Sequence, residues 1–303
     1  MHKNLAPICL FTYNRLEETK LTIESLQKNY LANQSKLYIF SDGGKNETSI
    51  KSVAAVREYL KQVNGFKEVI IIESKVNKGL ANSIIEGVTR IINEYGKIIV
   101  MEDDLVTSSN FLSYMNEGLA FYESSKNIWS VSGFSFPIDY PKSYEFDNAF
   151  GVRASSWGWA TWKSRWDLVD WDVTDYTEFL NDKKSRKAFN RGGSDMCSML
   201  HAQRTGKINS WAIRFCYAQF KQQAYDILPV KSKVVNVGFN GDASNTEGMG
   251  TRFRANLDEE GKSTFTFNNN IALNEDVLKQ FRKPLSISVR LLSKIKRKIK
   301  FWS

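Results

Sequence analysis

Short apolar runs alternate with longer segments of helical periodicity through the first 135 residues. The apolar runs predict strands at residues 6–12, 36–42, 68–73, 98–101 and 128–132. Apolar residues at helical spacing predict helices between them, at residues 16–30, 49–63, 80–95 and 111–122. Strands that alternate with helices are typical of βαβ units. The pattern therefore predicts an α/β fold with a mainly parallel, Rossmann-like central sheet flanked by helices.

One of these runs ends in three consecutive acids. Residues 98–101 lack the alternation of a half-exposed strand, and Glu102, Asp103 and Asp104 follow them directly. Ligands bind outside the carboxyl ends of strands in open α/β sheets. A hard divalent cation such as Mg²⁺ or Mn²⁺ beside a phosphate would relieve the mutual repulsion of three carboxylates. The alternative is a solvated acidic turn before the next helix, for which residues 107–110 offer N-cap side chains.

Polar side chains also follow two other predicted strands. Asn14 and Arg15 come after the first strand, and Asp42 ends the second strand with a glycine turn behind it. The carboxyl ends of parallel strands meet at one edge of a sheet, so these groups should lie near the acidic triplet. This convergence favours a functional site over a helix cap.

Aromatic residues and loop-like sequence dominate from residue 136 onward. Five of the eight tryptophans are Trp157, Trp159, Trp162, Trp166 and Trp171. Such clusters can form platforms on which sugar rings stack, or they can simply be core. The four-residue spacing of Trp162 and Trp166 favours a helix in the core, whereas Trp157 and Trp159 flank Gly158 in an expected loop, where both interpretations stay open.

Composition narrows the class of protein. The chain has 303 residues and a formal charge of +9, but the excess lies after Asp276, and the preceding part carries equal numbers of basic and acidic residues. This argues against a nucleic-acid-binding body. The two histidines and three scattered cysteines argue against a serine or cysteine hydrolase triad and a histidine-rich metal site. No apolar run is long enough to cross a bilayer and no signal peptide is apparent, so we expect a cytoplasmic protein.

The last twenty residues, 284–303, combine apolar residues at helical spacing with a cluster of lysines and arginines. This pattern predicts a C-terminal basic amphipathic helix that lies on the inner face of an anionic membrane. The alternative is a helix that packs against its own domain.

Five short motifs resemble one enzyme family. They are Phe-Thr-Tyr-Asn-Arg at 11–15, Ser-Asp-Gly-Gly at 41–44, Asn-Lys-Gly-Leu-Ala-Asn at 77–82, Val-Met-Glu-Asp-Asp-Leu at 100–105 and Ser-Val-Ser-Gly at 130–133. In this order they resemble nucleotide-sugar glycosyltransferases of the GT-A fold. The likeness is to the branch of N-acetylglucosaminyltransferase I and bacterial-type polysaccharide enzymes, where Glu-Asp-Asp replaces the usual Asp-x-Asp. It covers residues 5–170, and residues 157–162 look like the acceptor-side loop of that branch.

The resemblance implies a role for each acid of the motifs. Asp104 would ligate a Mn²⁺ or Mg²⁺ ion that bridges the donor phosphates. Asp103 would contact ribose or sugar hydroxyls, and Glu102 would orient the donor. Asp42 would accept a hydrogen bond from the base, as from uracil N3–H.

The uncharged and basic motif residues would complete the two substrate sites. The implied donor-binding residues are Thr12, Tyr13, Asn14, Arg15, Asn77 and Asn82. Trp157 and Trp159 are the implied acceptor-binding residues.

An inverting transfer also needs a general base. Our candidate is Asp195, a carboxylate that follows a glycine pair on the expected acceptor side, and Asp170 and Asp172 remain alternatives. Residues 209–214 are the part most like the paired-acid motif of the compared branch, but they contain no acid. The glycine-rich stretch from residue 229 to residue 245 either closes over the donor phosphates or is an ordinary surface loop.

The sequence thus predicts a metal-dependent glycosyltransferase that moves a sugar from a nucleotide diphosphate, with a UDP-sugar favoured, to a saccharide acceptor that is lipid-linked. The expected divisions are a nucleotide-sugar half at 1–135, an acceptor half of the same domain at 136–283, and the tail. One alternative is a sugar nucleotidyltransferase, although residues 11–15 lack the glycine-rich phosphate loop that it needs. The other is a catalytically silent, membrane-associated scaffold that binds nucleotides.

Overall fold

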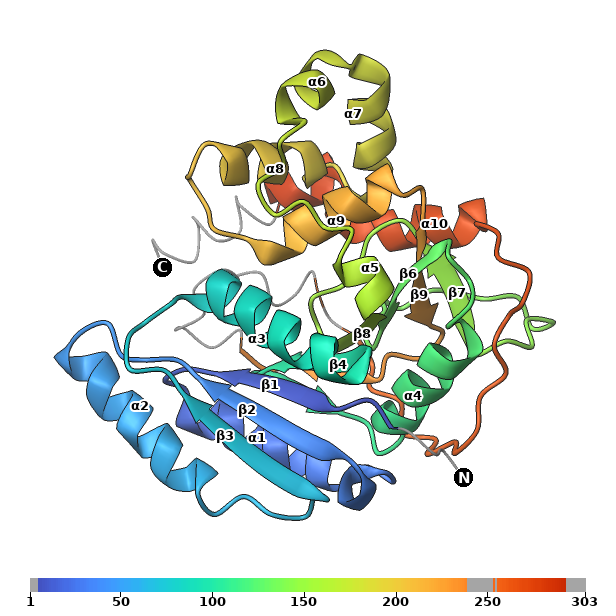
Figure 1. Ribbon diagram of the computed structural model, residues 1–303. Helices are drawn as coiled ribbons and strands as arrows, with labels where there is room; N and C mark the ends of the chain where they lie inside the picture. The colour runs from blue at the N-terminus through green and yellow to red at the C-terminus, as the bar shows by residue number, and fades with distance from the viewer. Residues whose placement is uncertain (1–4, 239–252, 254, 293–303) are drawn as a thin grey trace.

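A central sheet in the order β3-β2-β1-β4-β8-β6-β9-β7 runs through the protein (Figure 1). The computed structural model describes residues 5–238, 253 and 255–292. The strands are β1 (Ile8–Thr12), β2 (Lys36–Ser41), β3 (Glu68–Glu73), β4 (Lys97–Glu102), β6 (Ile128–Ser132), β7 (Asn148–Gly151), β8 (Trp159–Trp162) and β9 (Tyr225–Pro229). The first four are mutually parallel, and β6 is parallel to β9. The α/β fold with a mainly parallel sheet is therefore confirmed.

Helices cover both faces of this sheet, which explains why its strands lack polar alternation. The helices α1 (Leu16–Gln27), α2 (Glu47–Leu60) and α4 (Phe111–Phe121) pack into one core cluster, and α3 (Leu80–Tyr95) and α9 (Trp211–Lys221) pack into the other. Along β1, Ile8 and Leu10 enter the first cluster while Cys9 and Phe11 enter the second. Both faces of the strand are thus buried in apolar cores.

The position of β8 corrects two expectations, namely that Trp159 lies in a loop and that Trp162 shares a helix with Trp166. Trp159 and Trp162 both lie on this strand, which runs antiparallel between β4 and β6 and is buried along its whole length. The short helix α5 (Lys163–Trp166) begins only after Trp162. The four-residue spacing did not indicate a helix here because a strand buried on both faces imposes no period on its apolar residues.

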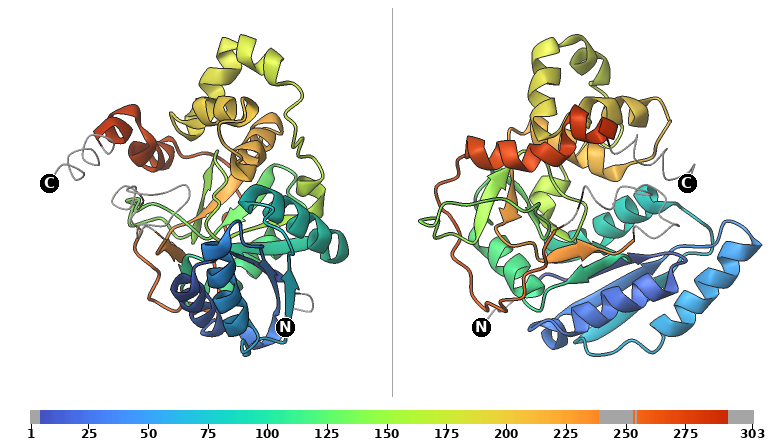
Figure 2. Two further views of the ribbon diagram at one scale, coloured as in Figure 1. Left: turned by 90° about the vertical axis from the view of Figure 1, so that its left-hand side faces the viewer. Right: turned by 180° about the vertical axis from the view of Figure 1, so that it is seen from behind.

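Four further helices lie later in the chain. They are α6 (Tyr176–Asn181), α7 (Lys183–Phe189), α8 (Met196–Arg204) and α10 (Glu275–Arg282). Short 3-10 turns are η1 (Ala32–Gln34), which lies between α1 and β2, η2 (Asn190–Gly192) and η3 (Lys283–Leu285). The helices α6 to α9 form the upper part of Figure 1, and Figure 2 shows the red C-terminal segment next to α8. Residues 287–292 are helical, whereas residues 293–303 of the expected tail helix lie outside the described residues.

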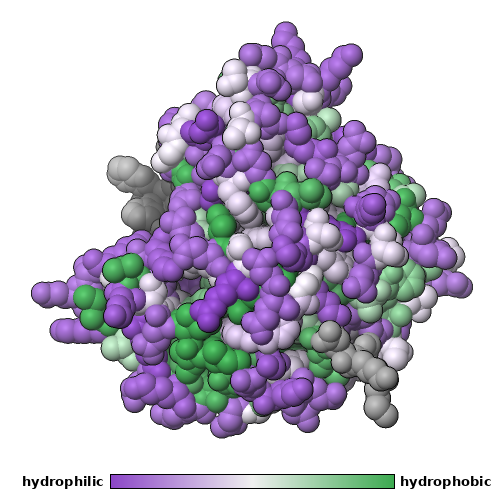
Figure 3. Space-filling model, in the orientation of Figure 1, coloured by the Kyte–Doolittle hydropathy of each residue, from purple (hydrophilic) through white to green (hydrophobic). Residues whose placement is uncertain are grey.

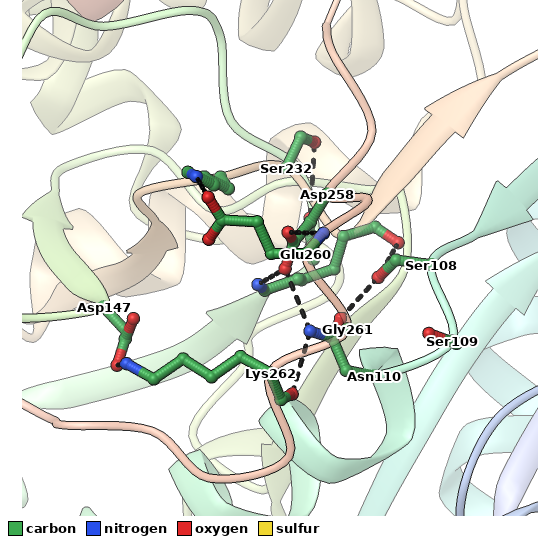
Figure 4. A network of polar contacts seen from close by, with 12 residues as sticks. Ser108, Ser109, Asn110, Asp147, Ser232, Asp258, Glu260, Gly261 and Lys262 are labelled. Atoms are coloured by element: carbon green, nitrogen blue, oxygen red, sulfur yellow. Dashed lines mark hydrogen bonds and ion pairs between the residues drawn. The ribbon is translucent and has the colours of Figure 1, made fainter.

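A second, two-stranded sheet begins at the residue that follows the acidic triplet. β5 (Leu105–Thr107) pairs antiparallel with β10 (Val234–Asn236). The base of β10 is fixed by Lys233, a buried cation that forms an ion pair with Asp258, which in turn accepts a hydrogen bond of 2.9 Å from Asn110 Nδ2 (Figure 4). This network joins the segment that contains Asp258 to the start of α4.

One edge of the central sheet leaves apolar side chains partly exposed. β3 is an edge strand, and its apolar residues 69–72 are only half-buried. A green area below α3 in Figure 3 lies over this edge. Among the described residues, no helix is both long and apolar enough to span a membrane.

Candidate active site

A cavity of about 720 Å³ opens at the carboxyl ends of β1, β2 and β4. Residues 11–15, Asp42 and residues 102–104 line one end of it. The other end is lined by residues of α8, of the start of α9 and of the C-terminal segment. The carboxyl ends of parallel strands are where an open α/β sheet leaves room for a ligand.

Arg15 joins the groups that follow β1 to those that follow β4. Its Nη1 atom donates to Asp104 Oδ2 at 3.1 Å, and its Nη2 atom forms an ion pair with Asp103 Oδ1. The backbone N–H of Tyr13 donates to the other oxygen of Asp103 at 3.1 Å. The predicted convergence of the polar strand ends is thus present in the structure.

Charge is concentrated at this end of the cavity. Burial, together with the neighbouring Asp104 and Asp103, raises the pKa of Glu102 to about 8. Burial also raises the pKa of Asp103 to about 6, although Arg15 acts in the opposite direction. Both shifts show that the ionised forms of these acids are disfavoured here even with Arg15 present, so a further cation beside the triplet would favour their ionised forms.

Asp104 has one oxygen suited to a metal ion. Its side chain is buried, and its Oδ1 atom has no hydrogen-bond partner among the described residues. A buried carboxylate oxygen without a partner is costly unless a ligand completes it, and carboxylate oxygen is a preferred ligand of Mg²⁺ and Mn²⁺. This atom fits the metal role that the resemblance implies. Within the described ranges, and at the triplet too, no three His, Cys, Asp or Glu side chains are arranged to hold a metal, so protein ligation would come from Asp104 alone.

The loop after β10 packs directly on Asp104. The backbone N–H of Val237 donates to the carbonyl oxygen of Asp104 at 2.8 Å. A Cβ atom on Gly238 would stand 2.3 Å from Asp104 Oδ2, so only glycine fits at this position. Residues 239–245, the rest of the loop expected to close over the donor, lie outside the described residues.

Asp42 organises the turns around it. Its Oδ1 atom accepts hydrogen bonds from the backbone N–H groups of Gly43 and Lys78, and its Oδ2 atom accepts one from Gly79, each at 2.9 Å. Asn77 supports the same turns, because its Nδ2 atom donates to the carbonyl oxygen of Gly43 at 2.7 Å. Both Asp42 and Asn77 line the cavity, and the contact of Asp42 with a base stays a prediction.

The other expected donor residues divide into two groups. Thr12, Tyr13 and Asn14 line the cavity, and Thr12 Oγ1 is a buried atom without a hydrogen-bond partner among the described residues. Asn82 does not line it. It lies in the first turn of α3 with its side chain bonded back to the carbonyl oxygen of Lys78, so we withdraw it from the candidate donor residues.

Among the described residues, Asp195 is the acidic side chain at the end of the cavity lined by α8. It lines the cavity at the N-cap position of α8, and Arg153 Nη1 and Nη2 donate to its two oxygens at 2.8 and 3.2 Å. Burial acts to raise the pKa of Asp195, but the charge and hydrogen bonds of Arg153 outweigh it and lower that pKa below its usual range. Asp170 and Asp172, the alternative bases, are absent from the lining, and Asp170 instead binds Thr174.

The two expected acceptor tryptophans have different positions. Trp157 is half-buried, lines the cavity and contacts Phe134 and Phe253 edge to face. Trp159 is 1% exposed and stacks on Trp211 with ring centroids 4.8 Å apart. Trp159 is therefore a core residue, and an acceptor cannot stack on it in this structure.

Sequence reasoning missed several residues of the cavity. Arg153 gave no local signal, because its partner Asp195 is 42 residues away. Residues 208–213 line the cavity at the start of α9, and Ser210, whose side chain caps this helix, was a signal that could have placed them. Phe281, Leu285 and Arg290 of the C-terminal segment also line it.

Comparisons with known proteins find fold-level likenesses alone. No family model and no curated protein sequence matches the chain. Among solved structures, residues 1–349 of TarS from S. aureus in complex with UDP match with a TM-score of 0.36 and 14% identity, over 55% of this chain and 48% of that chain. The mannosyltransferase PcManGT from Pyrobaculum calidifontis in complex with GDP-Man and Mn²⁺ matches with a TM-score of 0.37 and 9% identity, over 72% and 75%. Likenesses this distant carry no weight in assigning the activity, which rests on the site itself.

Proposed function

We propose that this protein is a nucleotide-sugar-dependent glycosyltransferase. The observation that carries the proposal is the meeting of Arg15, Asp103 and Asp104 at the strand ends, where one buried oxygen of Asp104 has no partner among the described residues. A site of this kind suits a diphosphate and a divalent cation, because it offers both a guanidinium and a free carboxylate oxygen. The cavity continues from there to the aromatic, half-buried Trp157.

The favoured donor is a UDP-sugar, and the transferred group is a hexosyl or N-acetylhexosaminyl unit. Asp104 would hold the Mn²⁺ or Mg²⁺ ion, and Arg15 would lie beside the donor phosphates. When bound, the ion would neutralise negative charge that develops on the leaving diphosphate.

Transfer with inversion requires three changes at the anomeric carbon. An acceptor hydroxyl oxygen forms a bond to that carbon, the bond from the carbon to the diphosphate oxygen breaks, and the hydroxyl proton passes to a base. Asp195 is our candidate for the base, because it is the acid that lines the acceptor end among the described residues. Its pairing with Arg153 makes it a weak base until the acceptor or a movement of Arg153 loosens that pair.

The proposed acceptor is a lipid-linked saccharide in the synthesis of a surface polysaccharide, and the proposed location is the inner face of the plasma membrane. The support for both is the C-terminal part of the sequence, which has no acid after Asp276 and nine lysines and arginines. Such a segment is attracted to anionic lipid.

Calorimetric titration tests the donor site. UDP, with GDP as comparison, is titrated into the wild type and the Asp104→Asn variant in Mn²⁺ and in EDTA. We expect UDP binding that depends on Mn²⁺ and that weakens at least about 10-fold in the variant, because a neutral amide oxygen is a poorer ligand than a carboxylate. Asp139→Asn, which removes an exposed acid outside the cavity, is the matched control.

Two results would count against the proposal. Absence of metal-dependent binding of either nucleotide would make the triplet a structural feature. Binding without release of UDP from a UDP-sugar, in the presence of candidate saccharide acceptors, would favour the silent nucleotide-binding scaffold.

A further inference from the structure

The C-terminal segment forms a wall of the cavity at the acceptor end. Phe281, Leu285 and Arg290 line the cavity together with Asp195. The carbonyl oxygen of Leu285 accepts a hydrogen bond from Ser194 Oγ at 2.7 Å and one from the Ser194 backbone N–H at 3.3 Å. The inner side of this segment is therefore fixed next to the candidate base.

Arg290 strengthens this attachment. Its Nη1 atom donates to Ser194 Oγ at 3.1 Å, and Ser194 immediately precedes Asp195. The expected alternative for the tail, a helix that packs against its own domain, thus holds for the inner side of residues 281–290. The first part of the tail is a component of the cavity rather than a free appendage.

The outer side of the same segment is apolar and exposed. Ile287, Leu291 and Leu292, which we call the apolar tail patch, are 63%, 54% and 57% exposed. They lie on the helical residues 287–292, where Ile287 and Leu291 are four residues apart and hence on one face. Three large apolar side chains so exposed and so close together indicate a surface that is covered by a partner.

The charge of the surrounding sequence identifies the kind of partner. The chain from Lys279 onward contains nine lysines and arginines and no acid. An apolar face flanked by cations complements an anionic lipid surface, where acyl chains take up the apolar side chains and headgroups take up the cations. A protein partner would have to offer an apolar groove surrounded by an equally dense cluster of acidic side chains.

We propose that the apolar tail patch docks on an anionic bilayer and that this contact turns the acceptor end of the cavity toward the membrane. The orientation of the cavity rests on the proposed function, since this orientation has meaning only if the acceptor is a saccharide carried by a membrane lipid. Leu285 and Arg290 line the cavity, and the exposed Ile287 and Leu291 of the same segment contact the bilayer. An acceptor carried by a lipid therefore has only a short distance to travel from the membrane to Asp195.

Vesicle sedimentation tests the docking surface without nucleotide. The full chain is mixed with vesicles of phosphatidylcholine and phosphatidylglycerol, and with vesicles of phosphatidylcholine alone. We expect the combined variant Ile287→Ser, Leu291→Ser and Leu292→Ser to bind the anionic vesicles at least about 10-fold more weakly than the wild type. The control is Leu21→Ser, Leu168→Ser and Leu180→Ser, which removes three apolar side chains that are 47%, 52% and 41% exposed elsewhere. A loss no greater than that of the control overturns the proposal.

Hydrogen exchange of the wild type on the same vesicles tests the orientation. We expect slower exchange both in residues 285–292 and in residues 194–199, which border the acceptor end of the cavity. Protection confined to the tail overturns the orientation. UDP binding by the tail-patch variant separates this inference from the proposed function, because that binding should equal the wild type whether or not vesicle binding is lost.

Discussion

The Nη1 atom of Arg15 lies 3.1 Å from Oδ2 of Asp104, and the same guanidinium is paired with Asp103. One cation thus holds together a strand end and an acidic turn that are nearly ninety residues apart in the sequence. Burial lowers the pKa of Arg15, but the two carboxylates outweigh burial and raise that pKa above its usual value. Arg15 therefore stays charged across the neutral range, and it supplies an internal cation to the acidic triplet.

Removal of this cation should destabilise the protein, and a divalent ion should restore part of the loss. In Arg15→Met the two carboxylates lose their partner, which costs about 3 kcal/mol of unfolding free energy in EDTA. Mn²⁺ should then raise the melting temperature of Arg15→Met more than that of the wild type, because the ion takes over the neutralising role. Thermal unfolding with and without Mn²⁺ measures both effects. Equal stability of Arg15→Met and the wild type in EDTA would show that the pair contributes nothing, and Arg15→Lys is the charge-conserving control.

Replacement of Asp195 should separate turnover from donor binding. We expect Asp195→Ala to lower kcat at least about 100-fold, as for loss of a general base, and to change UDP affinity less than about 3-fold. Because its pKa is lowered, Asp195 is ionised throughout the neutral range, and the part of the kcat profile that Asp195→Ala abolishes should be a decline as the pH falls into the acid range, when Asp195 takes up a proton. Steady-state kinetics across pH and calorimetry give the two readouts.

A structural role for Asp195 would have a different signature. Asp195→Ala leaves Arg153 buried without its partner under either role, so it should be less stable, and Arg153→Met in the same chain should recover that stability. If the role is structural alone, the double variant should recover turnover as well. Unchanged turnover in Asp195→Ala would discard its assignment as the base.

Asp226 should make stability depend on pH. It is fully buried on β9, its Oδ1 atom accepts a hydrogen bond of 2.6 Å from Ser130 Oγ, and burial raises its pKa well above the usual value, although Ser130 and the Ile227 backbone oppose this. The contribution of Asp226 to the free energy of unfolding is thus fully present below its unfolded pKa of about 3.9. That contribution is lost as the pH rises toward the folded pKa, at up to about 1.4 kcal/mol per pH unit. Asp226→Asn mimics the protonated acid and removes this loss.

Chemical denaturation at pH 4 and pH 8 measures the difference. We expect Asp226→Asn to gain stability relative to the wild type at pH 8 and to gain little at pH 4. Asp139→Asn, at an exposed position, should follow the wild type at both values. A wild type that loses no more stability with rising pH than Asp226→Asn would refute a raised pKa.

The ion pair of Lys233 and Asp258 supports β10, so its loss should lower the stability of the protein and disturb the residues around Asp104. Both side chains are buried, and Lys233 Nζ also lies 4.9 Å from the ring centroid of Phe265. Lys233→Met and Asp258→Asn should each cost about 3 kcal/mol of unfolding free energy, because each leaves a buried polar partner uncompensated. The double variant should cost at least about 1 kcal/mol less than the sum of the two.

The same variants should also affect the site. β10 carries Gly238 to Asp104, so we expect metal-dependent UDP binding to weaken in either single variant. Additive losses in a denaturant series would mean that the two side chains do not interact, and unchanged UDP affinity would mean that β10 is held by other contacts.

The sequence by itself determined the local features of residues 1–135. The bounds of β3 and β6 agree with the apolar runs at 68–73 and 128–132, since a short apolar run between helical segments marks a strand locally. The position of the acidic triplet at a strand end, and its meeting with Arg15, followed from the same pattern because parallel strands share a carboxyl edge.

Only the tertiary structure decided the arrangement of the chain after residue 135. The insertion of β8 antiparallel between β4 and β6 made Trp159 a core residue, and no local period distinguishes such a strand from a loop. The pair of Arg153 and Asp195 joins residues 42 apart, and the contact of Arg290 with Ser194 joins residues 96 apart. Contacts of this range depend on how helices and strands pack together, and the periodicity of a single segment records only which side of it is buried.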